Sequence, residues 1–399
     1  MRWPAGVVLG VIPAVYFVFV AAELGLMTHL ALQATAQGRS ALQVGLLATA
    51  LWGGILVASS LAHAAVQRLG HARVFVGATA VASAVTLAMA LHTGLAGWLV
   101  GAFLLGLCGG WVWVSGEAWL AEAAPPAQRG LLVGLFETAV GLGLMAGPAL
   151  VPLTRVLGLP TALACAGLMA LALAVSAVLL RVEPPAPAPE PAAPADAGAA
   201  ATPPTAPPVP APRAFVQGLL AVALLSGLME GGVSALMPSI AMRLGETLDS
   251  AAWLGAVIGA GSALLQPPAG HLADRFGVRR ITLGAWAVVL LANAVLLLAA
   301  AGSAAVVPVM WAVGFTLGGV GGAVYTLLIV ELGHRLAGAA LVRAIGGLVT
   351  AYAAGTAAGP TLGGWLFDAG GLPILAGALL LLSAAGLALT PRALRAGTP

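Results

Sequence analysis

Twelve long apolar stretches determine what this chain can fold into. Each has about 20 mostly apolar residues, the length that a helix needs to cross the hydrocarbon layer of a membrane. An isolated strand would leave its backbone groups unsatisfied in lipid, so these stretches predict helices. The expected spans are 6–31, 41–62, 74–92, 95–121, 130–154 and 159–180, followed by 214–241, 251–270, 281–300, 304–331, 344–366 and 372–390.

The composition supports an all-α membrane protein and argues against soluble classes. Charged residues make up only 7% of the chain and hydrophobic residues 61%, whereas soluble domains carry about 25% charged residues. The net charge of +3 is too small and too scattered for a nucleic-acid surface. Cys108 and Cys165 lie in apolar stretches without metal-like neighbours, so neither a metal nor another cofactor is expected.

A proline-rich segment separates the first six spans from the last six. Residues 182–212 hold 12 of the 27 prolines. Proline fixes φ and has no N–H to donate, so the segment predicts an extended, solvated linker. The sequence therefore predicts an N-terminal six-helix bundle at 1–181, a linker at 182–212 and a C-terminal six-helix bundle at 213–399.

The arginines predict the topology. With the N-terminus in the cytoplasm, 13 of the 16 arginines lie on the cytoplasmic side, and only Arg39, Arg155 and Arg243 face outward. An excess of positive residues is typical of cytoplasmic loops. We therefore expect a multi-pass protein of the cell's inner membrane, with the lipid bilayer around it and both termini in the cytoplasm.

The two halves of the chain are related by an internal repeat. Adding 207 to the numbering of the first half brings Glu23 onto Glu230 and Arg68 onto Arg275. Farther along, an offset of 212 brings Gly143 onto Gly355. Two pseudo-symmetric bundles of six helices are therefore expected.

A short motif between the spans 251–270 and 281–300 indicates a family. Residues 270–280 read G-H-L-A-D-R-F-G-V-R-R, with Asp274 and Arg275 at their centre. This closely resembles the cytoplasmic-loop signature of the major facilitator superfamily, G-x-x-x-D-R-x-G-R-R. The matching loop of the first half keeps Arg68 and Gly70 but has Gln67 in place of the acid. The resemblance implies the major facilitator fold over nearly the whole chain.

A second pattern consists of glycines followed by a proline. It looks like the signature of proton-coupled antiporters in the superfamily, although ordinary close packing of helices explains it equally well. A further stretch, with Glu117 and Arg129, is similar to YcaD-like bacterial permeases. The arginine typical of drug:proton antiporters is absent, and Ala102 stands in its place. The residues of the glycine pattern are Gly134, Gly143, Gly147 and Pro148 in the first half, and Gly346, Gly355, Gly359 and Pro360 in the second.

Glu23 and Glu230 are the foremost candidates for chemistry inside the membrane. A charge in hydrocarbon is costly, so an acidic residue within a span needs an explanation. Desolvation favours the neutral form of a carboxyl, which allows it to exchange protons. We predict that one or both bind protons, a cationic group of the substrate, or each in turn. The alternative is a permanently protonated structural pair. Glu137 is a third candidate, either as a proton or substrate site or as a partner of a neighbouring polar group.

Acidic residues near the cytoplasmic ends of spans suggest a gate. By resemblance, Glu117 is expected to join Arg68 or Arg129 in an ion network, and Glu331 to join Asp274, Arg275 or Arg343. Such pairs would hold the cytoplasmic side closed and break when it opens, whereas the alternative is a static anchor at the interface. The predicted gate consists of Arg68, Glu117, Arg129, Asp274, Arg275, Glu331 and Arg343.

The resemblance implies a secondary transporter that moves a small solute by alternating access, is coupled to protons and works as a monomer. The antiporter-like glycines favour export, and acids without arginines favour a cationic or neutral lipophilic substrate. An uptake permease for a small metabolite is one alternative, and a membrane sensor or scaffold that does not transport is another. No phosphate-binding loop or nucleophile motif indicates an enzyme.

Overall fold

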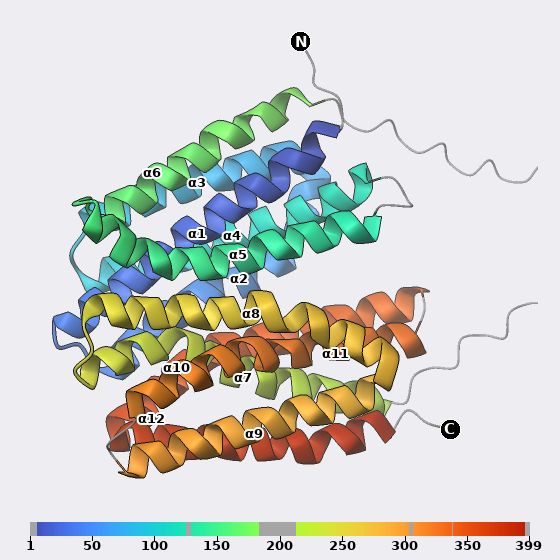
Figure 1. Cartoon of the computed structure of the whole chain (residues 1–399). Coiled ribbons are helices and arrows are strands. Elements are labelled where there is room, and N and C mark those ends of the chain that lie inside the picture. Colours follow the sequence, from blue (N-terminus) through green and yellow to red (C-terminus); the bar gives the residue numbers. More distant parts are fainter. Residues whose placement is uncertain (1–5, 125–128, 183–212, 303–305, 337, 396–399) are drawn as a thin grey trace, which may run out of the picture.

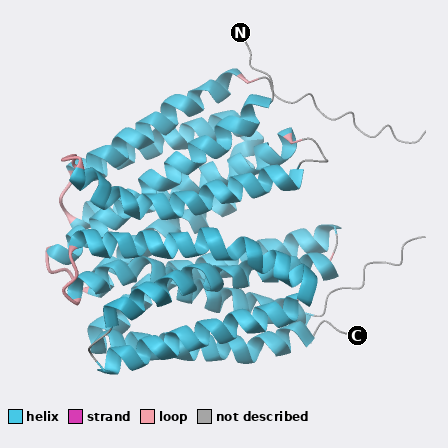
Figure 2. Ribbon diagram, viewed as in Figure 1, coloured by secondary structure: helices cyan, strands magenta, loops and turns pink. Residues whose placement is uncertain are grey.

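The computed structural model describes residues 6–124, 129–182, 213–302, 306–336 and 338–395, and they are almost entirely helical (Figure 2). Two bundles lie side by side, and neighbouring helices within each run roughly antiparallel (Figure 1). The first bundle contains α1 (Gly6–Ala36), α2 (Ala41–Leu69), α3 (His71–Leu91), α4 (Leu95–Ala123), α5 (Arg129–Val156) and α6 (Thr161–Ser176), which continues as the 3-10 helix η2 (Ala177–Arg181).

The second bundle contains two irregular elements. It begins with α7 (Arg213–Arg243), α8 (Leu248–Phe276) and α9 (Val278–Gly302). The next crossing is interrupted by a π-helical turn, η3 (Leu317–Gly321), between α10 (Val306–Thr316) and α11 (Gly322–Arg335). The last helix, α12 (Gly338–Arg395), has 58 residues and is broken at Gly370 and Gly371.

The break in α12 completes twelve crossings. Eleven helices of the described residues are long and apolar enough to span a membrane, and the last candidate, Arg343–Arg395, is far longer than one span. Gly371 has φ 71°, which favours glycine, and it turns the chain back. We call residues 338–369 the first arm of α12 and residues 372–395 the second arm. The predicted fold of twelve membrane helices in two six-helix bundles is confirmed.

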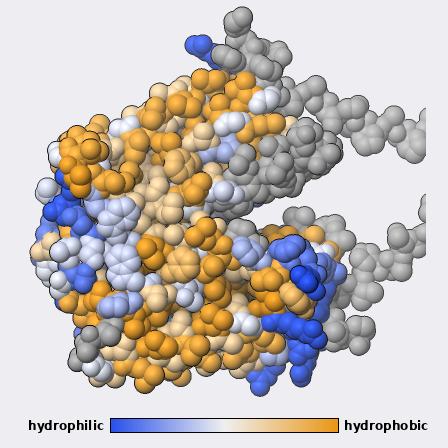
Figure 3. All heavy atoms as spheres, viewed as in Figure 1, coloured by the Kyte–Doolittle hydropathy of each residue, from blue (hydrophilic) through white to orange (hydrophobic). Residues whose placement is uncertain are grey.

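The two ends of the molecule differ from its middle. Figure 3 shows polar side chains gathered at both ends and an apolar surface between them. The beginning of α1 and the end of α12 lie at the same end, which we call the terminal end (Figure 1). The opposite end, which carries the connection from α1 to α2, is called the distal end. Apart from Val182, the predicted linker lies outside the described residues.

The internal repeat is visible in the backbone. Gly70 and Gly277, which the offset of 207 relates, both have positive φ, 79° and 89°, and each separates two consecutive helices. The prediction of a loop at the signature motif was wrong, because residues 270–276 form the last turns of α8 and only Gly277 connects it to α9. A polar helix end can extend beyond the hydrocarbon into water, so the end of an apolar stretch does not mark the end of the helix.

The glycine patterns bring helices of the same bundle into close contact. A Cβ atom added to Gly143 would lie 2.8 Å from Val20 of α1, and one at Gly147 would lie 3.0 Å from the carbonyl of Ala21. In the second bundle, Gly355 and Gly359 of α12 pack directly on the backbone of α7. Gly346 does not share this role, because a Cβ there would meet nothing within 4 Å. The surroundings of Gly134 lie outside the described residues.

This difference predicts the effect of two otherwise identical substitutions. Gly359→Ala places a methyl group against the carbonyl of Leu228, which belongs to a helix backbone and cannot move aside easily. We expect it to destabilise the protein by about 1–3 kcal/mol, the usual range for overpacking, and to lower the thermal midpoint in detergent. Gly346→Ala is the matched control and should leave the midpoint unchanged. Equal midpoints for the two variants would contradict this account of the glycines.

Candidate functional site

The distal ends of α2 and of the first arm of α12 are joined across the two bundles by Asp368. Its two carboxylate oxygens accept hydrogen bonds from the backbone N–H groups of Ala41 and Leu42, both at 2.9 Å. These are the first two residues of α2, whose next N–H, at Gln43, is capped by Ser40 of its own bundle. A carboxylate at a helix N-terminus is favourable because it pairs with free N–H groups and with the helix dipole.

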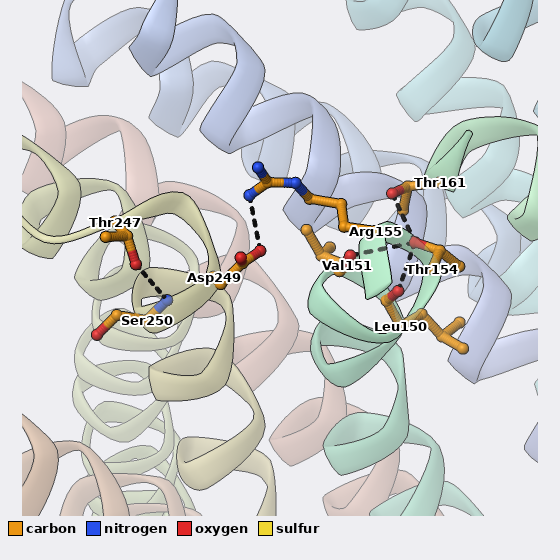
Figure 4. Close-up of polar contacts among 8 residues, drawn as sticks. All are labelled: Leu150, Val151, Thr154, Arg155, Thr161, Thr247, Asp249 and Ser250. Carbon is orange, nitrogen blue, oxygen red and sulfur yellow. Dashed lines mark hydrogen bonds and ion pairs between the residues drawn. The ribbon is translucent and has the colours of Figure 1, made fainter. Parts of the chain in front are cut away.

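Arginines add two further links at the distal end. Arg155, at the end of α5, forms an ion pair of 2.7 Å with Asp249, at the start of α8 (Figure 4). Arg243, at the end of α7, donates to the carbonyl of Arg39. Each of these contacts joins one bundle to the other. The three arginines that were predicted to face outward therefore lie at one end of the molecule, and all of them take part in holding the bundles together there.

Below these polar links the bundles pack backbone to backbone. A Cβ on Gly45 of α2 would collide with the carbonyl of Pro360, and one on Gly364 with the carbonyl of Ala41. Thr49 donates to the carbonyl of Ala357 at 2.6 Å. Between α5 and α8, Gly255 lies close to Pro148 and Gly259 close to the carbonyl of Leu144. The distal end is thus sealed by side chains and backbone together.

The terminal end is open. Figure 3 shows a notch between the two bundles at this end, whereas the hydrogen bonds of Asp368, Arg155 and Arg243 that join the bundles lie at the distal end. Arg68, Asp274 and Arg343 are exposed, and no ion pair joins them to another described residue. Arg275 lies over the ring of its neighbour Phe276, 5.2 Å from the centroid. The side chain of Arg129 lies outside the described residues.

The acids of the predicted gate have other surroundings than the motif suggested. Glu331 forms an ion pair with Arg335, one turn farther along α11, and not with Asp274, Arg275 or Arg343. Arg335 also lies over the ring of Phe215, 4.8 Å from the centroid. In the first bundle, Glu117 is half-buried and forms no ion pair with another described residue, whereas Glu122, five residues farther along α4, lies 3.2 Å from the ring of His71. An ion pair between residues one turn apart forms within a single helix and does not depend on the position of the other bundle. The motif does not include Arg335, so it could not predict this pair.

The distal seal leads to a second prediction. Asp368→Ala removes both hydrogen bonds to the start of α2, and losing such a cap typically costs about 1 kcal/mol, or roughly a fivefold change in an equilibrium. We therefore expect a larger fraction of molecules open at the distal end, measured by the spin-label distances described below. Glu246→Ala is the control, because Glu246 accepts from Ser250 of the same bundle. A larger effect for Glu246→Ala than for Asp368→Ala would contradict the role given to Asp368.

Glu230 lies at the centre of a polar cluster in the second bundle. It is the eighteenth residue of α7, which has 31, and Tyr352 of α12 donates a hydrogen bond of 2.6 Å to its Oε2. The ring of Tyr352 is stacked on that of Tyr325 from α11, with centroids 4.3 Å apart. Gln266 of α8 approaches the same place: a Cβ added to Gly322 would collide with its amide and lie 3.2 Å from Glu230 Oε1. Four helices thus meet around one carboxyl.

The π-helical turn shapes this cluster. Ser226, one turn before Glu230, donates to the carbonyl of Gly321 at 3.1 Å. Such turns occur often at functional sites, because they open the regular hydrogen bonding of a helix and redirect the residues that follow. Here the turn directly precedes Gly322 and Tyr325, so it sets the face that α11 presents to Glu230.

Glu23 has a different environment, although it too is the eighteenth residue of a 31-residue helix. α1 continues five residues beyond the predicted end, to Ala36, so Glu23 lies near the middle of its helix and not in the outer half as its place in the predicted span suggested. Its side chain is sealed, with 6% of the residue surface exposed. Its Oε1 is buried without a hydrogen-bond partner among the described residues, and it faces Gly109 of α4.

Several site residues were missed by the sequence analysis, and the side chain of one predicted residue, Glu137, lies outside the described residues. The composition contained one indication: the chain has only three tyrosines, and two of them stack on each other, one of which donates to Glu230. Nothing in the motifs pointed to a carboxylate capping a helix of the other bundle. The missed residues are Gln266, Tyr325, Arg335, Tyr352 and Asp368.

Two six-helix bundles, joined at one end, parted at the other and holding acidic groups in their interiors, define a class: membrane transporters that open to one side at a time. A sequence model described as the Major Facilitator Superfamily matches residues 11–247 and 219–398. The chain belongs to this superfamily.

Two bacterial relatives have similar sequences. The uncharacterized MFS-type transporter YfkF of Bacillus subtilis is 25% identical over 256 residues, which cover 62% of this chain and 61% of the relative. The chain thus spans about three fifths of the length of that relative. The uncharacterized MFS-type transporter YcaD of Escherichia coli is 27% identical over 282 residues, covering 69% of this chain and 68% of the relative. This similarity agrees with the resemblance found in the sequence.

Solved structures share the fold. A bacterial homologue of the human lysosomal transporter Spinster, in an inward-facing and unoccupied conformation, has a TM-score of 0.69 and 15% identity, with 98% of this chain and 95% of that chain covered. A D-xylose–proton symporter has a TM-score of 0.71 and 15% identity, covering 96% of each chain. The nucleoside transporter NupG has a TM-score of 0.71 and 11% identity, covering 98% of this chain and all of that one.

Proposed function

We propose that this chain exports a small cationic or neutral lipophilic compound across the inner membrane in exchange for protons, by alternating access and as a monomer. The excess of arginine at the terminal end supports a cytoplasmic position for that end. In this orientation the open notch faces the cytoplasm and the sealed distal end faces outward. An exporter takes up its cargo in this state.

One observation carries the proposal: Glu23 and Glu230 occupy equivalent positions in the interiors of the two bundles, and each arginine in the described part of the chain lies near a helix end or outside the helices. A carboxyl that has no basic partner in an apolar interior is most stable as the neutral acid. It can release its proton when a cation or water replaces it. Glu137 stays a candidate for a further proton site.

The opposite direction of transport is the second candidate. The solved structures of the same fold include a D-xylose–proton symporter and a nucleoside transporter. The amide of Gln266 beside Glu230 would suit a hydroxyl-rich solute as well. Export is favoured because the anionic group at the site is a carboxyl and the surrounding side chains are aromatic.

Sealed liposomes containing the pure protein test the proposal. With an acidic lumen and a pH dye inside, an exported cation added outside enters in exchange for protons, so the lumen becomes alkaline faster than without the compound. Tetraphenylphosphonium and ethidium serve as cations, and D-xylose and uridine test uptake. Proton movement with the sugar or the nucleoside and none with the cations would replace export by uptake, and no movement with any compound would contradict proton coupling.

A further inference from the structure

The hydrogen bond that Tyr352 donates to Glu230 has no equivalent at Glu23 Oε1, which has no partner among the described residues. The offset of 212 relates Tyr352 to Val140, which has no hydroxyl to donate. Glu117 and Glu331 differ by 214, as do Arg129 and Arg343, and this offset relates Tyr325 to Trp111. The repeat therefore keeps both glutamates, but among the described residues only Glu230 accepts a hydrogen bond from a tyrosine.

The two glutamates also differ in how far a cargo molecule can reach them. Glu230, Tyr325, Tyr352 and Gln266 are all half-buried, whereas Glu23 is sealed. A cargo can contact only side chains that it can reach, so the second bundle offers the binding surface in this conformation.

From these two observations we infer that Glu230, Tyr325 and Tyr352 form the binding site for an organic cation, such as an ammonium or phosphonium group carried on an apolar body. This inference rests on the proposed function and names the site and the chemical class of its cargo. Glu23 takes no part in contacting the cargo.

The chemistry of the three side chains fits a cation. The carboxylate supplies the negative charge, and the neutral hydroxyl of Tyr352 holds it in place at 2.6 Å without cancelling it. The stacked rings of Tyr325 and Tyr352 present electron-rich faces and edges to a positive group, an attraction that grows when water is excluded. An anion would be repelled by the same carboxylate, and no arginine of the described residues stands beside it to compensate.

The site also explains how cargo and proton exclude each other. A protonated Glu230 is neutral and has lost its attraction for a cation. A bound cation stabilises the ionised carboxylate, and the proton leaves to water. The hydroxyl of Tyr352 remains a donor to the carboxyl in both states, so the carboxyl keeps its position during the exchange.

Equilibrium binding to the full-length protein in detergent tests the inference without any gradient. The probes are ethidium, followed by fluorescence anisotropy, and tetraphenylphosphonium, with triphenylphosphine oxide as a neutral compound of similar shape. For the wild-type protein, cation affinity should strengthen as the pH rises, because protons compete for the same carboxyl. Glu230→Gln should weaken cation binding about tenfold or more, since an interaction with a charged group is lost, and should abolish the pH dependence.

Three further variants separate binding from folding. Tyr325→Leu should weaken binding about threefold to tenfold by removing an aromatic face. Tyr352→Phe keeps the ring, so it should bind cations but with a displaced pH profile. Glu122→Gln makes the same change of charge at a helix end, where the acid is 55% exposed, and should bind like the wild type. If Glu230→Gln does not fold, the pH dependence of the wild type and the Tyr325→Leu variant decide.

Three results would overturn the inference: equal cation affinity in the wild type and in Glu230→Gln, equally tight binding of triphenylphosphine oxide, or no cation binding at about 1 mM. A different result would show that the proposed function is wrong while the binding site is right. Cations that bind at Glu230 but move no protons in liposomes would contradict proton-coupled export and leave the binding site standing.

Discussion

Replacing Gly45 by leucine is expected to hold the transporter open at its distal end and to slow cargo turnover about a hundredfold. Gly45 lies where α2 meets the carbonyl of Pro360 in the other bundle, so close that even a Cβ atom would collide with it. A leucine side chain makes this contact impossible unless the bundles separate. Because both partners are helix backbone, small local movements cannot remove the collision.

Distances between spin labels measure the effect directly. One label at Gln37 and one at Leu244 report on the distal ends of the two bundles, after the buried cysteines Cys108 and Cys165 have been replaced by alanine. We expect the distribution in Gly45→Leu to move to longer distances. Gly53→Leu is the matched control, since it lies in the same helix and a Cβ there meets nothing within 4 Å. Wild-type distances and turnover in Gly45→Leu would show that the distal seal is not part of the transport cycle.

Replacing Glu230 by glutamine is expected to remove cation-driven proton movement almost completely, by about a hundredfold or more. Glutamine has nearly the same shape as a protonated glutamate and can still accept from Tyr352, so the fold should be kept. It can neither take up nor release a proton, and it carries no charge to attract a cation. Replacing one carboxyl oxygen by an amide nitrogen therefore removes both the exchange of the proton and the attraction for the cation.

Liposomes with a pH dye in the lumen measure this loss, and melting curves in detergent confirm that the variant is folded. Glu122→Gln should retain wild-type proton movement. Tyr352→Phe should retain the movement with a changed dependence on pH, because the carboxyl survives and only its hydrogen-bond donor is missing. Undiminished cation-driven proton movement in Glu230→Gln would exclude this carboxyl as the site of exchange.

The helices and the repeat could be predicted because they follow from apolar length and from residues at fixed offsets. Glu23 and Glu230 stood out for the same reason, since an acid within an apolar stretch is visible in any sequence. Both residues are the eighteenth of a 31-residue helix, and their role in binding protons or cargo stays a prediction. The motif at 270–280 named the family, although its residues form helix and not loop.

What the sequence could not show depends on contacts between distant segments. Asp368 looks like an ordinary polar residue at the end of a span, and only the approach of α2 makes it a cap. Tyr352 meets Glu230 from a position 122 residues away. The π-helical turn at Leu317–Gly321 has no sequence signal beyond its glycines, which could equally serve close packing. Glu331 pairs with Arg335 and not with a more distant basic residue, because residues one helical turn apart lie next to each other on the helix surface.

The most direct test of the account counts the protons released when cargo binds. The full-length protein in weakly buffered detergent is mixed with tetraphenylphosphonium, and a pH dye records the change in proton concentration. We expect cation binding to release protons from the wild type, to a similar extent from Glu23→Gln and not at all from Glu230→Gln. Cation binding without proton release in the wild type, or with undiminished release in Glu230→Gln, would contradict the exchange of proton for cargo at Glu230.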